Sequence, residues 1–267
     1  MEKPYVHGYD QQESIRLQDQ ANTLVELLHG DTAYTENATV LEAGCGVGAQ
    51  TITLARNSPK AIITSIDISE SSIAQARKTI KAAGLHNVSF QQGNIFHLDF
   101  APQSFDHVFL CFVLEHLVEP DEALKNLKRL LKPGGTITAI EGDHGSAYFY
   151  PDSAFARHAI QCQIDLQAKA GGNALIGRTL YPLLRKAGFE DVRVSPRMVY
   201  VDSSKPELVD GFTKNTFTAM VEGIRKEALE EQLISENDFD QGIADLHRTT
   251  EIDGVFCYTF FKAVGVK

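Results

Sequence analysis

A glycine-rich segment in the first fifth of the chain carries the clearest chemical signal. Residues 40–51 read VLEAGCGVGAQT, with Gly44, Gly46 and Gly48 at alternate positions between a β-branched stretch and a helix start. Glycine allows positive φ and lets a ligand approach without an intervening Cβ. Free N–H groups at the start of the helix can bind an anionic group. We predict a strand, a tight turn and a helix that hold a cofactor, with Gly48 letting the helix pack closely on the sheet.

Two carboxylates accompany this turn. Asp67 lies 19 residues beyond Gly48, at the end of a second predicted strand, where it can accept hydrogen bonds from ribose hydroxyls. Glu42 lies two residues before the first glycine. A carboxylate there would repel a pyrophosphate and could bind an ammonium group of a ligand. Alternatively, the carboxylate could accept hydrogen bonds from local backbone N–H groups and have no ligand. The loop G-C-G-V-G also departs from the G-x-G-x-x-G of dinucleotide sites, so a dinucleotide oxidoreductase is a less favoured alternative.

The elements that position these residues alternate between strand and helix, which is typical of a parallel sheet covered by helices on both faces. Strand-like runs occupy 38–44, 61–67, 87–93, 105–112 and 136–142. Predicted helices cover roughly 13–29, the stretch from Ser69 as N-cap to Gly84, and 120–131, before a turn at 132–135.

The second half of the chain has a different pattern. Two helical stretches, 153–170 and about 178–187, precede β-rich runs at 191–201 and 255–264. An antiparallel pair needs only a short turn, so a helical insertion is predicted between these runs, over 205–248, with a capping box at Ser235 and Asp238. We therefore expect four segments: an N-terminal helical lid (1–37), a cofactor-binding core (38–145), a helical segment after strand five (146–190), and a terminal β-pair carrying the insertion (191–267).

The glycine turn and several further motifs together resemble those of a known protein family. The pattern E-x-G-x-G-x-G resembles motif I of class I S-adenosylmethionine-dependent methyltransferases. Asp67, the loop 93–95, the segment SFDHVFLCFVLEHL (104–117) and the turn LKPGG (131–135) match later family motifs in the right order. The match covers about 40–142, and it looks most like the small-molecule branch that includes ubiquinone and menaquinone C-methyltransferases.

This resemblance implies an α/β, Rossmann-like fold: a seven-stranded, mostly parallel sheet with helices on both faces, an antiparallel last strand and a helical cap. It also implies S-adenosylmethionine as cofactor, S-adenosylhomocysteine as product, and no metal. The cofactor-binding residues expected on this basis are Tyr9, Gln20, Glu42, Gly44, Gly46, Gly48, Gln50, Asp67, Ile68, Asn94, Ile95 and Phe112. Relatives commonly have Asp at the position of Asn94, whose amide oxygen can still accept from the adenine amino group.

Plainer roles stay open for several of these residues. Gln50 could be a solvent-exposed helix residue, Phe112 a core residue, and Tyr9 and Gln20 surface residues rather than parts of a lid.

Two histidines at strand ends are candidate general bases, because imidazole titrates near neutral pH. His116 follows the fourth predicted strand and His144 the fifth. His116 could instead be a structural imidazole held between helix and sheet. The expected acceptor-lining residues are Tyr148, Phe212 and Met220, although the aromatic run could anchor the next helix and the insertion could pack on the sheet or on a second copy of the chain.

The amino-acid composition indicates which classes of partner the protein can bind. Lys and Arg total 25 against 35 Asp and Glu, a net charge of −10, which argues against nucleic acid and anionic membranes and favours a small-molecule acceptor. The longest fully apolar run is Val108 to Leu114, too short to span a bilayer, and the N-terminus lacks a signal-peptide pattern, so we expect a cytoplasmic protein. The four cysteines form no C-x-x-C pair, so no metal centre or disulfide framework is predicted.

Other functions remain compatible with the motifs. The same turn could hold an adenosyl cofactor for sensing, regulation or a different transfer. The four cysteines also leave an arsenic-type thiol methyltransferase conceivable.

Overall fold

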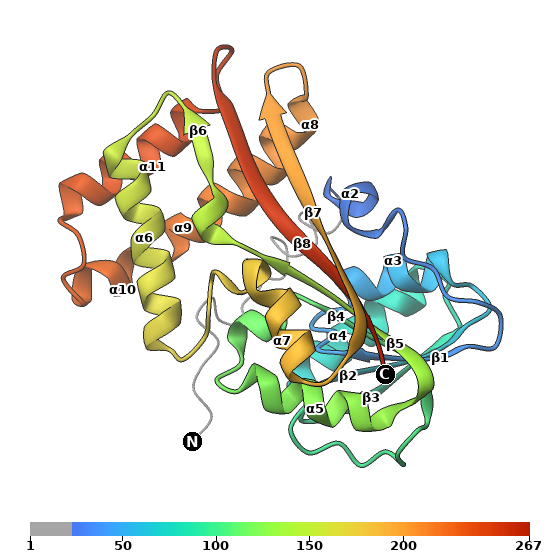
Figure 1. Ribbon diagram of the computed structural model, residues 1–267. Helices are drawn as coiled ribbons and strands as arrows, with labels where there is room; N and C mark the ends of the chain where they lie inside the picture. Colours follow the sequence, from blue (N-terminus) through green and yellow to red (C-terminus); the bar gives the residue numbers. More distant parts are fainter. Residues whose placement is uncertain (1–22) are drawn as a thin grey trace. The chain divides into compact units, whose positions relative to one another are not determined.

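The computed structural model describes residues 23–267, which form two compact units (Figure 1). The sheet unit comprises Val25–Glu141, Ile176–Pro196 and Phe261–Lys267. The helical unit comprises, among the described residues, 23–24, Gly142–Leu175 and Arg197–Phe260. Two strands, β7 (Glu190–Asp202) and β8 (Val255–Val266), are divided between the units, and the last residue of β5 (Leu131–Gly142) also belongs to the helical unit.

The sheet is mostly parallel, as predicted. Its first strands are β1 (Thr39–Ala43), β2 (Ile62–Asp67), β3 (Val88–Gln92), β4 (Phe105–Cys111) and β5 (Leu131–Gly142). They follow the order β3-β2-β1-β4-β5, all neighbours pair in parallel, and β8 comes next to β5. This order places the carboxyl ends of β1, β2 and β4 along one edge, where open α/β sheets bind ligands.

The described sheet has eight strands rather than seven. The additional strand is β6 (Tyr148–Tyr150), which pairs antiparallel with the first half of β8, and β7 pairs with β8 as expected. The LKPGG motif also differs from expectation, since it lies inside β5 rather than before it. Phe105 faces Leu131 whereas His107 already faces Thr136, so the motif forms an irregularity in the β4–β5 register.

Short-range signals explain the helices of the sheet unit. These are α2 (Val25–His29), α3 (Ala49–Asn57), α4 (Glu70–Ala82), η1 (Leu114–His116), α5 (Pro120–Leu130), η3 (Ile176–Thr179) and α7 (Leu180–Lys186). Ser69 caps α4 as predicted, because its side chain accepts a hydrogen bond from the Ser72 N–H. Pro120 occupies the first turn of α5, where its missing N–H costs nothing.

Two hydrophobic clusters hold these helices to the sheet. In the larger cluster, Leu124 and Leu127 of α5 and Leu184 of α7 pack against Val108 of β4 and Ile137 of β5, and all are fully buried. The smaller cluster joins Ile73 and Ile80 of α4 to Phe90 of β3. Burying each such side chain contributes about 1.5–3 kcal/mol, so the core fixes the strand ends that carry the candidate site.

The helical unit is built from one short strand and a set of helices. They are η2 (His144–Ser146), β6, α6 (Ala154–Lys169), α8 (Pro206–Leu208), the π-helix η4 (Val209–Thr218), α9 (Ala219–Gly223), α10 (Arg225–Glu230) and α11 (Glu236–Arg248). Helices α6 and α11 pack side by side (Figure 1). Their contact is close, since a Cβ on Gly242 of α11 would lie 2.7 Å from the Phe155 carbonyl oxygen of α6.

Aromatic side chains form the interior of the helical unit. Phe212 and Phe217 of η4 pack against Phe256 and Tyr258 of β8, with ring centroids 4.8 to 6.1 Å apart. Phe149 of β6 stacks on Phe256 at 6.2 Å. None of the helices among residues 23–267 has both the length and the apolar character needed to cross a membrane.

Candidate functional site

The glycine turn between β1 and α3 adopts the backbone conformation that the sequence predicts. Gly44, Gly46 and Gly48 have φ of 84°, 51° and 84°. The N–H groups of Gly44 and Cys45 donate to the Ile66 carbonyl of β2 at 2.8 and 2.9 Å. The turn is therefore fixed to the neighbouring strand before any ligand binds.

The three glycines of the turn have different steric surroundings. A Cβ on Gly44 would lie 2.5 Å from Cγ2 of Val113, and a Cβ on Gly48 would lie 3.1 Å from Cα of Ala76 in α4. Gly48 thus permits close packing on α4, whereas we expected close packing on the sheet. A Cβ on Gly46 would meet nothing within 4 Å. Of the three glycines, Gly46 is therefore the one that borders open space, from which a ligand could approach the turn.

Asp67 is held in place at the end of β2 by two backbone groups. Its Oδ2 accepts from the Gly46 N–H at 2.8 Å, and its Oδ1 accepts from the Ser69 N–H at 2.9 Å. A carboxylate has about four acceptor positions, so both oxygens can still accept hydroxyl hydrogen bonds. Asp67 therefore links the glycine turn to α4 and retains the capacity to bind a ribose.

Glu42 is a buried carboxyl beneath the turn. It is 2% exposed, and its Oε2 accepts from Thr51 Oγ1 at 2.8 Å and from Ser65 Oγ at 2.5 Å. These partners are hydroxyls, not the backbone N–H groups considered above. Burial raises the pKa of Glu42 to about 7, although the two hydroxyl hydrogen bonds oppose the shift. Glu42 supports the first turn of α3, and its charge depends on pH near neutrality.

The loops after β2 and β3 contain the next expected residues. The Asn94 Oδ1 accepts from the Phe96 N–H at 2.9 Å, so this oxygen already stabilises a local turn. Ile68 is 41% exposed, and Ile95 packs partly buried on the larger cluster. Gln92, which we did not single out, donates from Nε2 to the Ile68 carbonyl at 2.9 Å and joins the two loops.

Strand β4 ends in a strained residue. Phe112 has φ of 58°, in the left-handed region that non-glycine residues rarely occupy, and its N–H still donates to the Ile140 carbonyl at 2.9 Å. Such strain persists only where surrounding contacts impose it, and it concentrates at functional sites. His116, in η1, has its Nε2 3.5 Å from Glu115 Oε1.

Gln50 has a partner that the sequence did not indicate. Its Oε1 lies 2.7 Å from Nε2 of His29, so it joins α3 to α2. Burial lowers the pKa of His29 to about 4, which keeps the imidazole neutral. Tyr9 and Gln20 lie outside the described residues.

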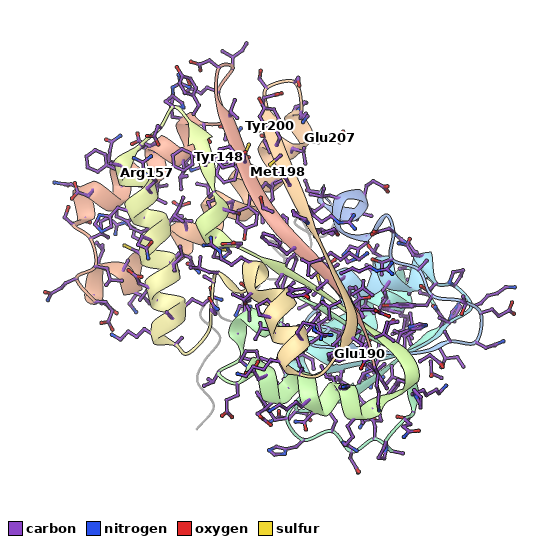
Figure 2. All side chains as sticks on the ribbon, in the orientation of Figure 1. Tyr148, Arg157, Glu190, Met198, Tyr200 and Glu207 are labelled. Carbon is purple, nitrogen blue, oxygen red and sulfur yellow. The ribbon has the colours of Figure 1, made fainter. Side chains whose placement is uncertain are left out.

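The expected acceptor residues belong to the helical unit and differ in exposure. Phe212 is 1% exposed and Met220 is 7% exposed, so both are interior residues. Tyr148 is 58% exposed on β6 and donates from Oη to Met198 Sδ of β7 at 3.6 Å; Figure 2 labels both residues and the nearby Tyr200.

The second candidate base has a partner that the sequence did not reveal. His144 is 7% exposed, and its Nδ1 lies 2.7 Å from Oη of Tyr258. The Phe217 ring packs edge-on against the imidazole at 6.2 Å. Tyr258 is distant in sequence, and only the fold of β8 brings it to His144.

The described residues contain no cluster of three or more His, Cys, Asp or Glu side chains arranged to hold a metal ion. The four cysteines are buried free thiols, and burial raises the pKa of Cys45 and Cys111. The open space at Gly46 and the remaining acceptor positions of Asp67 suit the ribose of an adenosyl cofactor.

Comparison with known proteins agrees with this geometry. A family model described as a methyltransferase domain matches residues 34–188. An uncharacterized methyltransferase of Schizosaccharomyces pombe is 33% identical over 147 residues, which are 53% of this chain and 52% of that protein. A demethylmenaquinone methyltransferase of Listeria welshimeri is 35% identical over 103 residues, which are 38% of this chain and 44% of that protein. The chain thus spans about half the length of these curated relatives.

A solved structure shares the fold at lower identity. Phosphoethanolamine N-methyltransferase 2 of Haemonchus contortus, in complex with phosphomonomethylethanolamine and S-adenosylhomocysteine, superposes with a TM-score of 0.56 at 16% identity. The alignment covers 93% of this chain and 52% of that chain.

Proposed function

Because the chain belongs to the methyltransferase-domain family, we propose that it is an S-adenosylmethionine-dependent methyltransferase that transfers the methyl group in line to a small-molecule acceptor. The observation that carries the cofactor part is the open space over Gly46 beside an Asp67 whose two oxygens are already oriented by backbone N–H groups. Relatives named for a quinone precursor and for phosphoethanolamine support a small acceptor, as does the net charge of −10.

The cofactor would lie along the carboxyl edge of β1, β2 and β3. In this proposal Asp67 accepts from the ribose hydroxyls, Asn94 and Ile95 border the adenine, and Glu42 supports the turn from below. The N–H groups at the start of α3 face the same edge. No residue in this set requires a metal ion.

The chemistry asks little of the protein beyond orientation. Bound S-adenosylmethionine would supply an already activated methyl group. The residues of the chain then orient the acceptor, exclude water and, where the acceptor needs it, remove a proton. We propose His144, oriented by Tyr258, as the group that takes this proton, with His116 as the alternative.

The direct test combines binding with a product search. Purified protein is incubated with methyl-labelled S-adenosylmethionine and a metabolite extract, and labelled products are identified by mass spectrometry. We expect a labelled small molecule. Label appearing only in protein or nucleic acid would contradict the proposal.

Asp67→Ala gives the matching test of the cofactor site. Losing charge-assisted hydrogen bonds to the ribose should cost about 1.5–3 kcal/mol, or roughly ten- to more than one-hundred-fold in affinity, measured by calorimetry. Equal affinity of wild type and Asp67→Ala would remove the ribose assignment.

A further inference from the structure

A buried side chain continues the hydrogen bonding of β4 where the strand ladder stops. The last paired residues of β4 and β5 are Cys111 and Ile140, and the Phe112 N–H makes the final backbone bond to β5. The next two N–H groups, of Val113 and Leu114, donate to Oε1 of Glu141 at 3.0 and 2.8 Å. Glu141 is 0% exposed. Its carboxyl therefore takes the place of a strand at the turn that follows β4.

This turn supports the glycine loop directly. The Val113 side chain occupies the space beside Gly44, since a Cβ on Gly44 would lie 2.5 Å from Val113 Cγ2 and 3.1 Å from Val113 Cγ1. On its other side Val113 is fixed at the carbonyl, which accepts from the His116 N–H at 3.1 Å. A shift of the Val113 backbone would therefore move the contact that shapes the first glycine of the turn.

The surroundings of the Glu141 carboxyl disfavour its charged form. Among the described residues, Oε2 is buried and has no hydrogen-bond partner. Burial, reinforced by the nearby Glu115 carboxyl, raises the pKa of Glu141 well above its usual range. A glutamine carries no charge and keeps a carbonyl oxygen that can accept from the Val113 and Leu114 N–H groups.

We propose that Glu141 is a positioning residue of the cofactor site: its Oε1 fixes the backbone at Val113 and Leu114, and Val113 in turn fixes the glycine turn at Gly44. This inference rests on the proposed cofactor site. Glu141 acts through the backbone that it holds, so this role requires an acceptor oxygen at its position.

Four variants separate this role from general stability. Calorimetry on the full chain measures the affinity for S-adenosylmethionine and S-adenosylhomocysteine, and thermal melting of the ligand-free protein is recorded beside it. Glu141→Gln should bind both ligands within about twofold of wild type, because the accepting oxygen remains. Glu141→Leu should bind at least about tenfold more weakly, because two buried N–H groups lose their partner and the turn moves.

The other two variants are Val113→Ala and Leu130→Ala. Val113→Ala removes the contact with Gly44 and should weaken binding in the same direction. Leu130, a fully buried residue of α5, serves as the matched control, since Leu130→Ala should lower the melting temperature while leaving both affinities unchanged. If Glu141→Leu fails to fold, Glu141→Asp, whose carboxyl is one methylene too short, takes its place.

The outcomes are distinguishable. Glu141→Gln binding as weakly as Glu141→Leu, or Leu130→Ala losing affinity equally, would overturn the positioning role while leaving the cofactor site intact. A folded wild-type protein that binds neither ligand would overturn the cofactor site, and the role of Glu141 with it.

Discussion

Gly46 and Gly84 present the same local geometry in different surroundings. Both have positive φ, 51° and 67°, and a Cβ on either would meet nothing within 4 Å. Only Gly46 donates its N–H to Asp67. The two residues therefore allow backbone strain to be separated from ligand contact, since a valine is strained at both positions but would meet a ligand at only one.

Gly46→Val should abolish binding of S-adenosylmethionine, whereas Gly84→Val should leave the affinity unchanged. Both substitutions should destabilise the fold by roughly 1–2 kcal/mol or more, because a side chain disfavours left-handed backbone. Calorimetry and urea unfolding of the two variants measure these effects. Normal affinity in folded Gly46→Val would mean that the turn is only structural.

Glu42 should make stability depend on pH. Its pKa is about 7 in the folded protein against 4.5 for the free side chain, so the folded state holds its proton longer than the unfolded state does. The free energy of unfolding should therefore fall as pH rises from about 4.5 to about 7, by up to about 3 kcal/mol from this group.

Glu42→Gln isolates this contribution, because its amide oxygen can still accept from Thr51 and Ser65 but does not titrate. Urea unfolding of the ligand-free proteins at pH 5 and pH 8 should show a smaller pH effect in Glu42→Gln than in wild type. Parallel curves for the two proteins would contradict the raised pKa.

Some residues of the candidate site could be predicted from local sequence patterns, and others could not. The alternate glycines and Asp67 could be predicted because a ligand-binding turn demands particular residues at fixed spacing. The role of Glu141 could not be predicted, because a glutamate at a strand end forms no recognisable sequence motif. Its contacts arise only when β4 and β5 pair. The contact between Gln50 and His29 could not be predicted for the same reason, because His29 comes from a separate helix.

Among elements, capped helices were predicted and the π-helix was not. Ser69 and Ser235 accept hydrogen bonds from N–H groups three residues further along the chain. These caps could be predicted because they depend only on residues close together in the sequence. In contrast, Leu208, Phe212 and Met220 recur at nearly helical spacing, yet 209–218 is a π-helix. The wider turn is set by tertiary packing of Phe212 and Phe217 on β8.

Threonine hydroxyls in η4 should respond oppositely to substitution. Among residues 23–267, the buried Thr213 hydroxyl has no hydrogen-bond partner, whereas Thr216 Oγ1 donates to the Gly211 carbonyl at 2.7 Å. Thr213→Val should be neutral or stabilising, because it removes an unsatisfied buried polar group, and Thr216→Val should cost about 1 kcal/mol. Thermal melting compares them. Equal destabilisation by both would show that the Thr213 hydroxyl is satisfied in solution.

Strand β6 and the contact between His144 and Tyr258 could not be predicted from the sequence. The aromatic run at 147–151 could be a pocket lining or a helix anchor, and only pairing of Tyr148 with Cys257 of β8 makes it a strand. The same pairing explains Tyr258, which lies 114 residues from His144. Contacts across such separations depend on the complete topology.

At the scale of the whole molecule, cofactor and acceptor functions fall on different parts of the chain. All described residues proposed to bind the cofactor belong to the sheet unit, whereas the candidate acceptor residues belong to the helical unit. The chain passes from one unit to the other at Gly142, the last residue of β5. We therefore expect the sheet unit to bind S-adenosylmethionine and the helical unit to select the acceptor.

Hydrogen exchange should resolve the two contributions. S-adenosylhomocysteine alone should slow exchange at 44–50 and 67–69, because these N–H groups border the proposed cofactor site. The acceptor identified by methyl labelling, added on top, should slow exchange mainly in 143–170 and 205–248, since long inserted segments commonly carry specificity. Peptides from 120–130 on α5 serve as the internal reference. Bound acceptor that leaves both helical segments unchanged would place acceptor selection in the sheet unit instead.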